Sequence, residues 1–317
     1  MALLTRITLP NGALANDSQT FLGAGSLFTT GTVIFVNSVT GSNDNAGTDP
    51  GSPKATVQGA ISVATASKGD KIICMPGHAE TVTATSINLS KAGVHVICIG
   101  TGLARPTFTY GAAAATITVS AANCAFLGGH HIGNFLDVAS AFTLGAAKDF
   151  QLTGNTFVDN SSSLGFLSIV VTNATANAAD GLMVSGNTWT GLDVSPNAFI
   201  SILEANNKVT IEDNDVFMGA TNDVGHFITL SSFNVLSMRI RRNVLIVTGS
   251  TAAAVGIFLT GSGTASLGVG SDNFISSLDT TTELIATAGT GLDFFRNEYT
   301  GVADKSGYIL PAIDSAA

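Results

Sequence analysis

The sequence is poor in charged residues, and its basic residues are few and scattered. Only 11% of the 317 residues are charged, and 13 Lys and Arg residues stand against 22 Asp and Glu residues. Neutralising the phosphates of a nucleic acid requires clustered Lys and Arg, and the one dense basic group is Arg239, Arg241 and Arg242. With a formal net charge of −9, we expect no nucleic-acid partner.

Long apolar runs are also missing. No stretch approaches the roughly 18 consecutive apolar residues that indicate a membrane-spanning helix. The first ten residues, Met1 to Pro10, lack the basic segment followed by an apolar segment that marks a secretory signal. We therefore expect no membrane partner and no secretory signal in this sequence.

Cysteine is scarce as well. The chain has Cys74, Cys98 and Cys124, an odd number, and each lies in an apolar segment. This pattern favours buried, reduced thiols over a disulfide framework. No Cys-x-x-Cys pair exists, and the His130–His131 pair lies in a separate Gly-rich segment, so a zinc site is not expected. The sequence predicts no metal and no cofactor.

What the sequence does contain is a repeat. Six short blocks in the second half each end in Asn, with strand-like residues before the Asn. The six residues are Asn155, Asn187, Asn214, Asn243, Asn273 and Asn297. These Asn residues are 32, 27, 29, 30 and 24 positions apart. A period of this size in a strand-type pattern indicates a solenoid in which each repeat is one coil.

A second strand-like segment precedes each block, from residues 142–144 in the first to 283–286 in the last. Equivalent strands recur in one direction, which favours parallel stacking. The sequence therefore predicts an all-β protein, a single-stranded right-handed parallel β-helix.

The N-terminal part follows a different pattern. Residues 32–37 and 70–75 are β-branched strand candidates, and Ser52 and Pro53 are typical of a helix N-cap and first helical position. We predict a capping α-helix over about residues 52–67 that covers the open end of the first coil. The expected organisation is an apolar arm (1–31), packing on its own solenoid or on a neighbour, and a β-helix (32–317). The β-helix comprises a cap (32–82) and stacked coils (83–317).

The repeat predicts two columns of side chains along the solenoid. Stacked Asn amides can bond to one another, and Asn tolerates the left-handed bend of a sharp corner, so we interpret the Asn column as structural rather than as a ligand-binding row. The residues immediately before four of the Asn residues alternate in sign. They are Asp213, Arg242, Asp272 and Arg296. We interpret them as an ion-pair ladder between coils rather than as a catalytic carboxylate and arginine.

Candidates for catalysis are few. The densest acidic cluster is Glu212, Asp213 and Asp215, with Asp213 and Asp215 expected on one side of a strand, as a calcium site or a glycosidase pair would require. However, Arg241 and Arg242 in the next coil compete as counter-ions. Weaker candidates are Asp293 with Glu298, Asp44 with Asp49, and the histidines His78, His95, His130, His131 and His226, which share no repeat position with a Ser or Asp. We predict no catalytic residue among them.

The N-terminal third carries a recognisable motif. Residues 35–53 read Phe-Val-Asn-Ser-Val-Thr-Gly-Ser-Asn-Asp-Asn-Ala-Gly-Thr-Asp-Pro-Gly-Ser-Pro, and Ala-Thr-Val-Gln-Gly-Ala-Ile, Gly-Asp-Lys-Ile-Ile and Pro-Gly-His-Ala-Glu follow at residues 55, 69 and 76. These segments resemble the N-terminal cap of pectate-lyase-like right-handed β-helix proteins. The form with Pro-Gly-His-Ala-Glu-Thr-Val is similar to that of bacteriophage and prophage virion proteins of this superfamily.

This resemblance implies the fold more strongly than the activity, because β-helices serve as lyases, hydrolases, tailspikes and capsid decorations. Enzymatic members resemble one another in an acidic calcium cluster and an Arg base on one sheet face. The nearest equivalents here, Asp213, Asp215 and Arg242, are expected to neutralise one another. With one Trp and three Tyr, aromatic platforms for sugars are scarce.

We therefore expect a non-enzymatic virion protein, made in the host cytoplasm, that decorates or cements the capsid surface. Its expected partners are the major capsid protein, contacted through the N-terminal arm, and two further copies of itself in a homotrimer. One alternative is a tailspike or tail fibre that binds, and possibly cleaves, host surface polysaccharide. The other is a free polysaccharide lyase or glycoside hydrolase.

Overall fold

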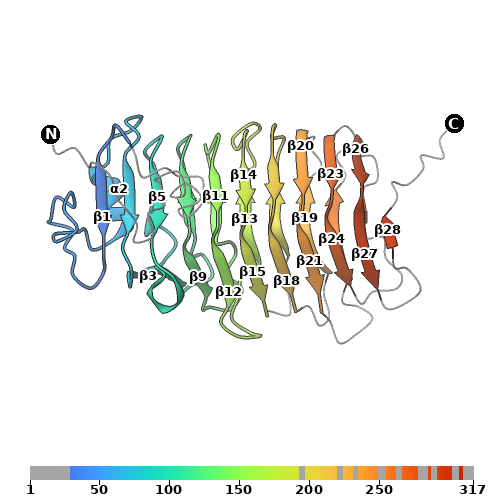
Figure 1. Cartoon of the computed structure of the whole chain (residues 1–317), viewed down its shortest axis with the longest axis horizontal. Helices are drawn as coiled ribbons and strands as arrows, with labels where there is room; N and C mark the ends of the chain where they lie inside the picture. The colour runs from blue at the N-terminus through green and yellow to red at the C-terminus, as the bar shows by residue number, and fades with distance from the viewer. Residues whose placement is uncertain are drawn as a thin grey trace, which may run out of the picture.

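The computed structural model describes residues 29–192, 197–219, 224–230, 235–248, 255–261, 266–277, 285–286, 291–301 and 307–309. These residues form a rod of stacked coils, and the chain advances along the rod from one end to the other (Figure 1). All but the last three residues of the predicted N-terminal arm, 1–31, lie outside the described residues. No helix among the residues described is both long and apolar enough to cross a membrane.

Three sheets run the length of the rod. Sheet A contains β1 (Val33–Val36), β2 (Lys71–Cys74), β5 (His95–Cys98), β8 (Ala125–Leu127), β11 (Gln151–Thr153), β14 (Met183–Ser185), β17 (Thr210–Glu212), β20 (Leu236–Arg241), β23 (Leu267–Ser271) and β26 (Gly291–Phe295). Sheet B contains β3 (Ala79–Val82), β6 (Thr107–Tyr110), β9 (His130–Gly133), β12 (Thr156–Asp159), β15 (Thr188–Gly191), β18 (Asp215–Met218), β21 (Val244–Val247), β24 (Phe274–Ser277), β27 (Asn297–Gly301) and β28 (Gly307–Ile309). Sheet C contains β4 (Ile87–Leu89), β7 (Ile117–Val119), β10 (Phe142–Leu144), β13 (Ser168–Thr172), β16 (Ala198–Ile202), β19 (Val224–Leu230), β22 (Val255–Gly261) and β25 (Ile285–Ala286).

The strand pairing confirms the predicted fold, a right-handed parallel β-helix. Each strand pairs in parallel with the equivalent strands of the coils before and after it, as β11 does with β8 and β14. The exception is β28, which pairs antiparallel to β27 at the C-terminal end. The sequence predicted at least two strands in each coil, and the structure has three. The third strand, in sheet B, starts at or one residue after the Asn.

The predicted capping helix is present but shorter than expected. Helix α2 spans Val57–Val63, and its N-cap is Thr56, whose hydroxyl accepts a hydrogen bond from the Gly59 amide. The prediction of a helix over residues 52–67, capped by Ser52, was wrong at both ends. Lys54 is held beside β1, where its amide donates to the Phe35 carbonyl at 2.8 Å.

The C-terminal end of α2 is also fixed by tertiary contacts. Ala64 is already extended, with ψ of 148°, and the Thr65 amide donates to the buried Asp70 carboxylate at 2.7 Å. The same carboxylate accepts the Thr32 amide at 2.7 Å. Asp70 therefore ties the end of the helix to the start of β1, and the chain cannot continue as a helix to residue 67.

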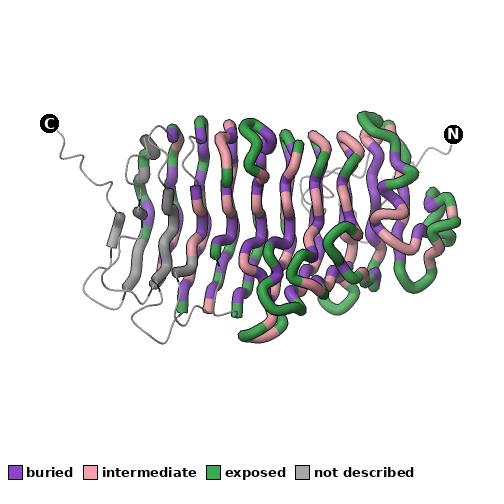
Figure 2. The backbone as a smooth tube through the Cα atoms, turned by 180° about the vertical axis from the view of Figure 1, so that it is seen from behind, coloured by how far each residue is buried: buried purple, intermediate pink, exposed green. Residues whose placement is uncertain are grey.

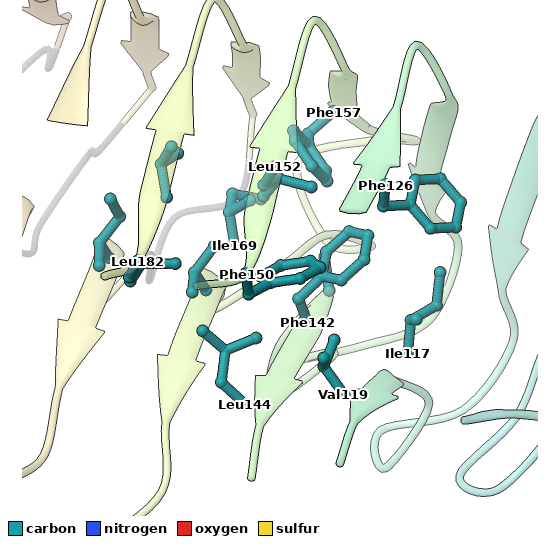
Figure 3. Packing of buried hydrophobic residues seen from close by; sticks show 14 of the residues in the cluster. Ile117, Val119, Phe126, Phe142, Leu144, Phe150, Leu152, Phe157, Ile169 and Leu182 are labelled. Atoms are coloured by element: carbon teal, nitrogen blue, oxygen red, sulfur yellow. The ribbon is translucent and has the colours of Figure 1, made fainter. Parts of the chain in front are cut away.

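The core lies inside the solenoid. Residues along each strand alternate between the interior and the outer surface, so buried and partly exposed residues alternate along the coils (Figure 2). Phe142 of β10, Leu152 of β11 and Phe150, which lies directly before β11, pack together in the interior (Figure 3). Because no coil can bury its inner face alone, stability depends on contact with neighbouring coils.

Candidate functional site

The most regular feature of the rod is the corner between sheets A and B, which holds the six predicted Asn residues in one buried column. The first five Asn side chains each donate from Nδ2 to Oδ1 of the Asn in the next coil, at 2.8–3.1 Å. The same Oδ1 atom also accepts the backbone amide of the preceding Asn, as Asn243 does from Asn214 at 3.1 Å.

The Asn Nδ2 groups also donate hydrogen bonds to backbone carbonyls. Asn187 Nδ2 donates to the Ser185 carbonyl in its own coil and to the Leu152 carbonyl in the coil before, at 3.1 and 2.8 Å. At the N-terminal end of the column, Asn155 Oδ1 accepts the amide of Gly129 at 2.9 Å. The six residues are at most 1% exposed. These amides hold coils together, and none is open to a ligand.

The left-handed bend of this corner lies one residue earlier than the sequence suggested. The residue immediately before each Asn, and not the Asn, has positive φ, between 53° and 66° in all six coils. These residues are Gly154, Gly186, Asp213, Arg242, Asp272 and Arg296. The interpretation that Asn supplies the bend was therefore wrong: the Asn backbone amide is needed for the bond to the next Asn, and the preceding residue makes the turn.

The charged residues at this corner form ion pairs between coils. Arg242 makes two hydrogen bonds to the Asp213 carboxylate, at 2.7 and 2.8 Å, and Arg296 donates to Asp272 at 2.9 Å. In the adjacent column, Arg241 binds Glu212 at 2.6 Å. The hydrogen bond from Arg242 lowers the pKa of Asp213, so this carboxylate is ionised and neutralised by its partner.

The prediction that Asp213 and Asp215 lie on one side of a strand was wrong, because the Asp213–Asn214 corner separates β17 from β18. Asp213 is a corner residue, whereas Asp215 is the first residue of β18 and is exposed on the outer face of sheet B. The corner therefore divides the predicted acidic cluster, and the calcium or glycosidase pair that required both carboxylates on one face is not formed.

Asp215 instead lines an open hollow on the outer face of sheet B. The hollow spans β15, β18 and β21 and is lined by Thr188, Trp189, Thr190, Asp215, Val216, Phe217, Val244 and Ile246. Phe217 is 38% exposed there, whereas Trp189 is buried. This surface was not predicted from the sequence, because the third strand of each coil was not predicted. Alternating side chains directly after each Asn were the available signal.

The other predicted carboxylate pairs are not brought together. Asp293 pairs in register with Val269 on sheet A, and Glu298 pairs with Phe274 on sheet B. In the N-terminal loop, the Asp49 carboxylate accepts the Gly51 amide at 2.7 Å, and Asp44 is exposed. Within the described part of the chain, none of these four carboxylates forms an ion pair with a basic residue.

His131 lies inside an aromatic cluster in the core. Its ring stacks between Phe108 and Phe157, with centroids 5.2 and 4.7 Å away, and the Tyr110 hydroxyl lies 3.1 Å from Nδ1. Burial lowers the pKa of His131 to about 3, so the ring is neutral. Substrate has no access to it, which makes His131 a core residue.

His78 belongs to the cap. Its Nδ1 accepts the Ser38 amide at 3.1 Å, and its Nε2 lies 3.2 Å from Glu80 Oε2. The same Glu80 oxygen accepts the amide of Val57, the first residue of α2, at 2.9 Å. The Pro-Gly-His-Ala-Glu motif therefore joins β3 and α2 to the turn after β1, and its His and Glu build the cap.

The remaining histidines and the thiols offer no assembled site. Burial lowers the pKa of His95, His130 and His226. The three cysteines are free thiols, and a hydrogen bond with Cys98 together with burial raises the pKa of Cys74. Among the described residues, no three His, Cys, Asp or Glu side chains come together in a group that could hold a metal ion.

Comparison with known proteins gives a likeness of shape only. No protein-family model matches this sequence, and no curated protein matches it. Among solved structures, a rhamnogalacturonan lyase aligns over 88% of this chain and 90% of its own, with a TM-score of 0.44 and 14% sequence identity. At that level the likeness does not bear on activity, and the parallel β-helix fold rests on the strand pairing described above.

Proposed function

We propose that this protein is a non-enzymatic structural protein of a bacteriophage virion, a β-helical rod that decorates or cements the capsid surface as a homotrimer. Its partners in this proposal are the major capsid protein, contacted through residues 1–31, and two further copies of the chain. The observation that carries the proposal is the use of the corner charges: they are bound to one another between coils and not aimed at a substrate.

The ion pairs between coils support a structural role for these charged residues. Glu212 accepts Arg241 at 2.6 Å and lies 3.4 Å from Arg242, which also binds Asp213. A lyase of this fold would need such carboxylates free for a cation and such an arginine free to remove a proton. Here each group would first have to lose its partner in the neighbouring coil, and the paired arrangement is the one that stabilises a rod.

The N-terminal cap also supports the proposal. The segment that resembles phage virion β-helices, Pro76–Glu80, is engaged in hydrogen bonds to Ser38, just after β1, and to α2. A closed first coil prevents end-to-end association of open strand edges. That property suits a protein displayed at high local concentration on a shell.

Reconstruction of the parent virion by electron cryomicroscopy tests the proposal. We expect density for the rod at three-fold or quasi-three-fold positions of the capsid, with residues 1–31 in contact with the shell. Virions from a phage lacking this gene product provide the difference map. Density at the tail tip, or no density on the virion, would refute the capsid role.

A tailspike role, with binding of host surface polysaccharide, is the second candidate, and the hollow on sheet B favours it. Exposed Phe217 offers an apolar ring against which a sugar can stack, and the adjacent Asp215 and Thr188 side chains can accept hydrogen bonds from hydroxyl groups. Titration with purified host polysaccharide tests this role, with Phe217→Ala as the variant. Binding that is saturable and lost in Phe217→Ala would favour the tailspike; no binding would exclude it for that glycan.

A further inference from the structure

The outer face of sheet A carries a second apolar cluster, separate from the core. Ile73, Ile97 and Leu127 occupy equivalent positions on β2, β5 and β8, and they point outward because Ile72, Val96 and Phe126 point inward. Ala125 belongs to the same cluster, and Val33, Phe35 and Ile99 pack against it. An outward apolar row of this kind is unusual on a strand that faces water.

These outward side chains are withdrawn from solvent. Ile73, Ile97 and Leu127 are only 1–3% exposed, whereas the outward residues Phe217 on sheet B and Val269 farther along sheet A are 38% and 36% exposed. Helix α2 is not the cover, since its buried residues Val57, Ala60 and Ile61 belong to the interior core. The burial of these side chains therefore requires a cover that α2 does not supply.

The apolar character ends abruptly along the rod. The column begins with Phe35, Ile73, Ile97 and Leu127, and continues in register with Thr153, Ser185, Glu212 and Arg241. Four strands about 4.8 Å apart give an apolar face of roughly 14 Å, a length that one short segment covers. A partner that covered the whole rod would not stop at the fourth coil.

The chain itself supplies such a segment. Residues 1–28 contain the apolar residues Leu3, Leu4, Ile7, Leu9, Phe21, Leu22, Leu27 and Phe28, and only two charged residues, Arg6 and Asp17. The chain joins the rod at the same end as the cluster, where the Thr29 hydroxyl donates to the Gly69 carbonyl just before β2. We propose that residues 1–28 pack in cis on the outer-face cluster of sheet A and cover its first four strands.

This inference concerns the isolated protein and does not depend on the proposed virion role. Its test is photo-crosslinking in the full-length chain, with p-benzoylphenylalanine in place of Phe35. The matched control places the same group at Phe217, an outward Phe of sheet B. From position 35 we expect crosslinks into residues 1–28, identified by mass spectrometry, and from position 217 we expect none into that segment.

Mixing isotope-labelled and unlabelled chains distinguishes the occupants. Crosslinks within one chain support the proposal, whereas crosslinks between chains would assign the face to the arm of a second copy and overturn it. A crosslink only to other parts of the chain, or none, would also overturn it. In the combined variant Phe21→Asp and Leu22→Asp, the yield should fall to that of the position-217 control, while Asn16→Asp should leave it unchanged.

Discussion

At the scale of single residues, the rod depends on buried Asn side chains that donate and accept hydrogen bonds between coils. The Asn column places an amide between every pair of adjacent coils from Asn155 onward, in a corner where backbone carbonyls would otherwise lack donors. A buried donor or acceptor left without a partner costs about 1–3 kcal/mol. Removing one amide disturbs three coils, because its partners lie in the coil before and the coil after.

We expect Asn214→Ala to lower the free energy of unfolding by on the order of 3 kcal/mol, since it orphans the amide of Asn187 and the carbonyl of Val184 in the interior. Asn160→Ala is the matched control: its side chain bonds to Asn134 at an exposed site, and surface changes of this kind stay within about 0.5 kcal/mol. Urea unfolding of both variants measures the difference. Equal stability of the two would contradict a structural column.

His131 predicts a pH effect of definite sign. Its pKa falls from an ordinary 6.5 to about 3 in the folded protein, so below pH 6.5 the unfolded chain takes up a proton that the folded protein excludes. The stabilisation is complete above pH 6.5 and is lost as pH falls towards 3, by about 1.4 kcal/mol per pH unit. We expect His131→Leu to show a smaller drop in Tm than the wild type between pH 7 and pH 4.

The Tyr110 hydroxyl can keep a partner in that variant, because it also lies 3.2 Å from the Ala141 carbonyl. His130→Leu, at a half-buried neighbouring position, controls for general effects of losing a histidine. An identical drop in Tm in wild type and His131→Leu would mean that carboxylates alone set the acid sensitivity. This role of His131 was not predictable from the sequence, because burial of a histidine depends on which coils flank it.

At the scale of the element, the corner before each Asn requires a left-handed residue. Gly adopts this conformation without strain, whereas for other residues the left-handed conformation costs about 1–2 kcal/mol of conformational energy. The coils at Gly154 and Gly186 use glycine, whereas Asp213, Arg242 and Asp272 accept the strain and form ion pairs between coils. The left-handed position is therefore occupied either by glycine or by a charged residue that forms an ion pair with the neighbouring coil.

Gly154→Ala measures the conformational cost of the left-handed backbone alone. A Cβ at Gly154 would meet no atom within 4 Å, while φ is +66°, so the expected loss of about 1 kcal/mol is conformational. Gly111→Ala is the control, because its φ is not positive and its added Cβ would make an ordinary 3.6 Å contact with Thr81. Calorimetry that ranks the two variants equally would show that this corner is not strained.

Elements were predictable from the sequence where a pattern repeats and were misplaced where a tertiary contact decides. The Asn period located the corner, and the apolar strand segments before it located sheets A and C. The start of α2 was misplaced because Ser52–Pro53 is a good local helix start, whereas the bond from Lys54 to Phe35 draws those residues into an extended path. Sequence alone does not reveal that bond.

At the scale of the whole molecule, the outer faces of the rod differ in charge. One column on sheet B reads Thr109, Ile132, Val158, Thr190, Phe217, Ile246 and Ser276 in register and contains no charged residue. The equivalent columns of sheet A contain Glu212, Arg239 and Arg241 in the later coils. The division of the acidic cluster between these faces could not be predicted, because it depends on a third strand that the repeat alone did not separate from the turn.

The neutral column on sheet B is the surface that best suits contact between parallel rods in the proposed homotrimer, since it combines apolar side chains with no charge to desolvate. We expect the wild type to have three times the 32.1 kDa mass of the chain in light scattering at micromolar concentration. The double variant Phe217→Asp and Ile246→Asp should dissociate to monomers, because it places carboxylates where three rods meet. Thr210→Asp, on the outer face of sheet A, should remain trimeric. A wild-type monomer would contradict the trimer itself, whereas a double variant that stays trimeric with an unchanged Tm would move the interface to another face and leave the sheet B hollow free for a glycan.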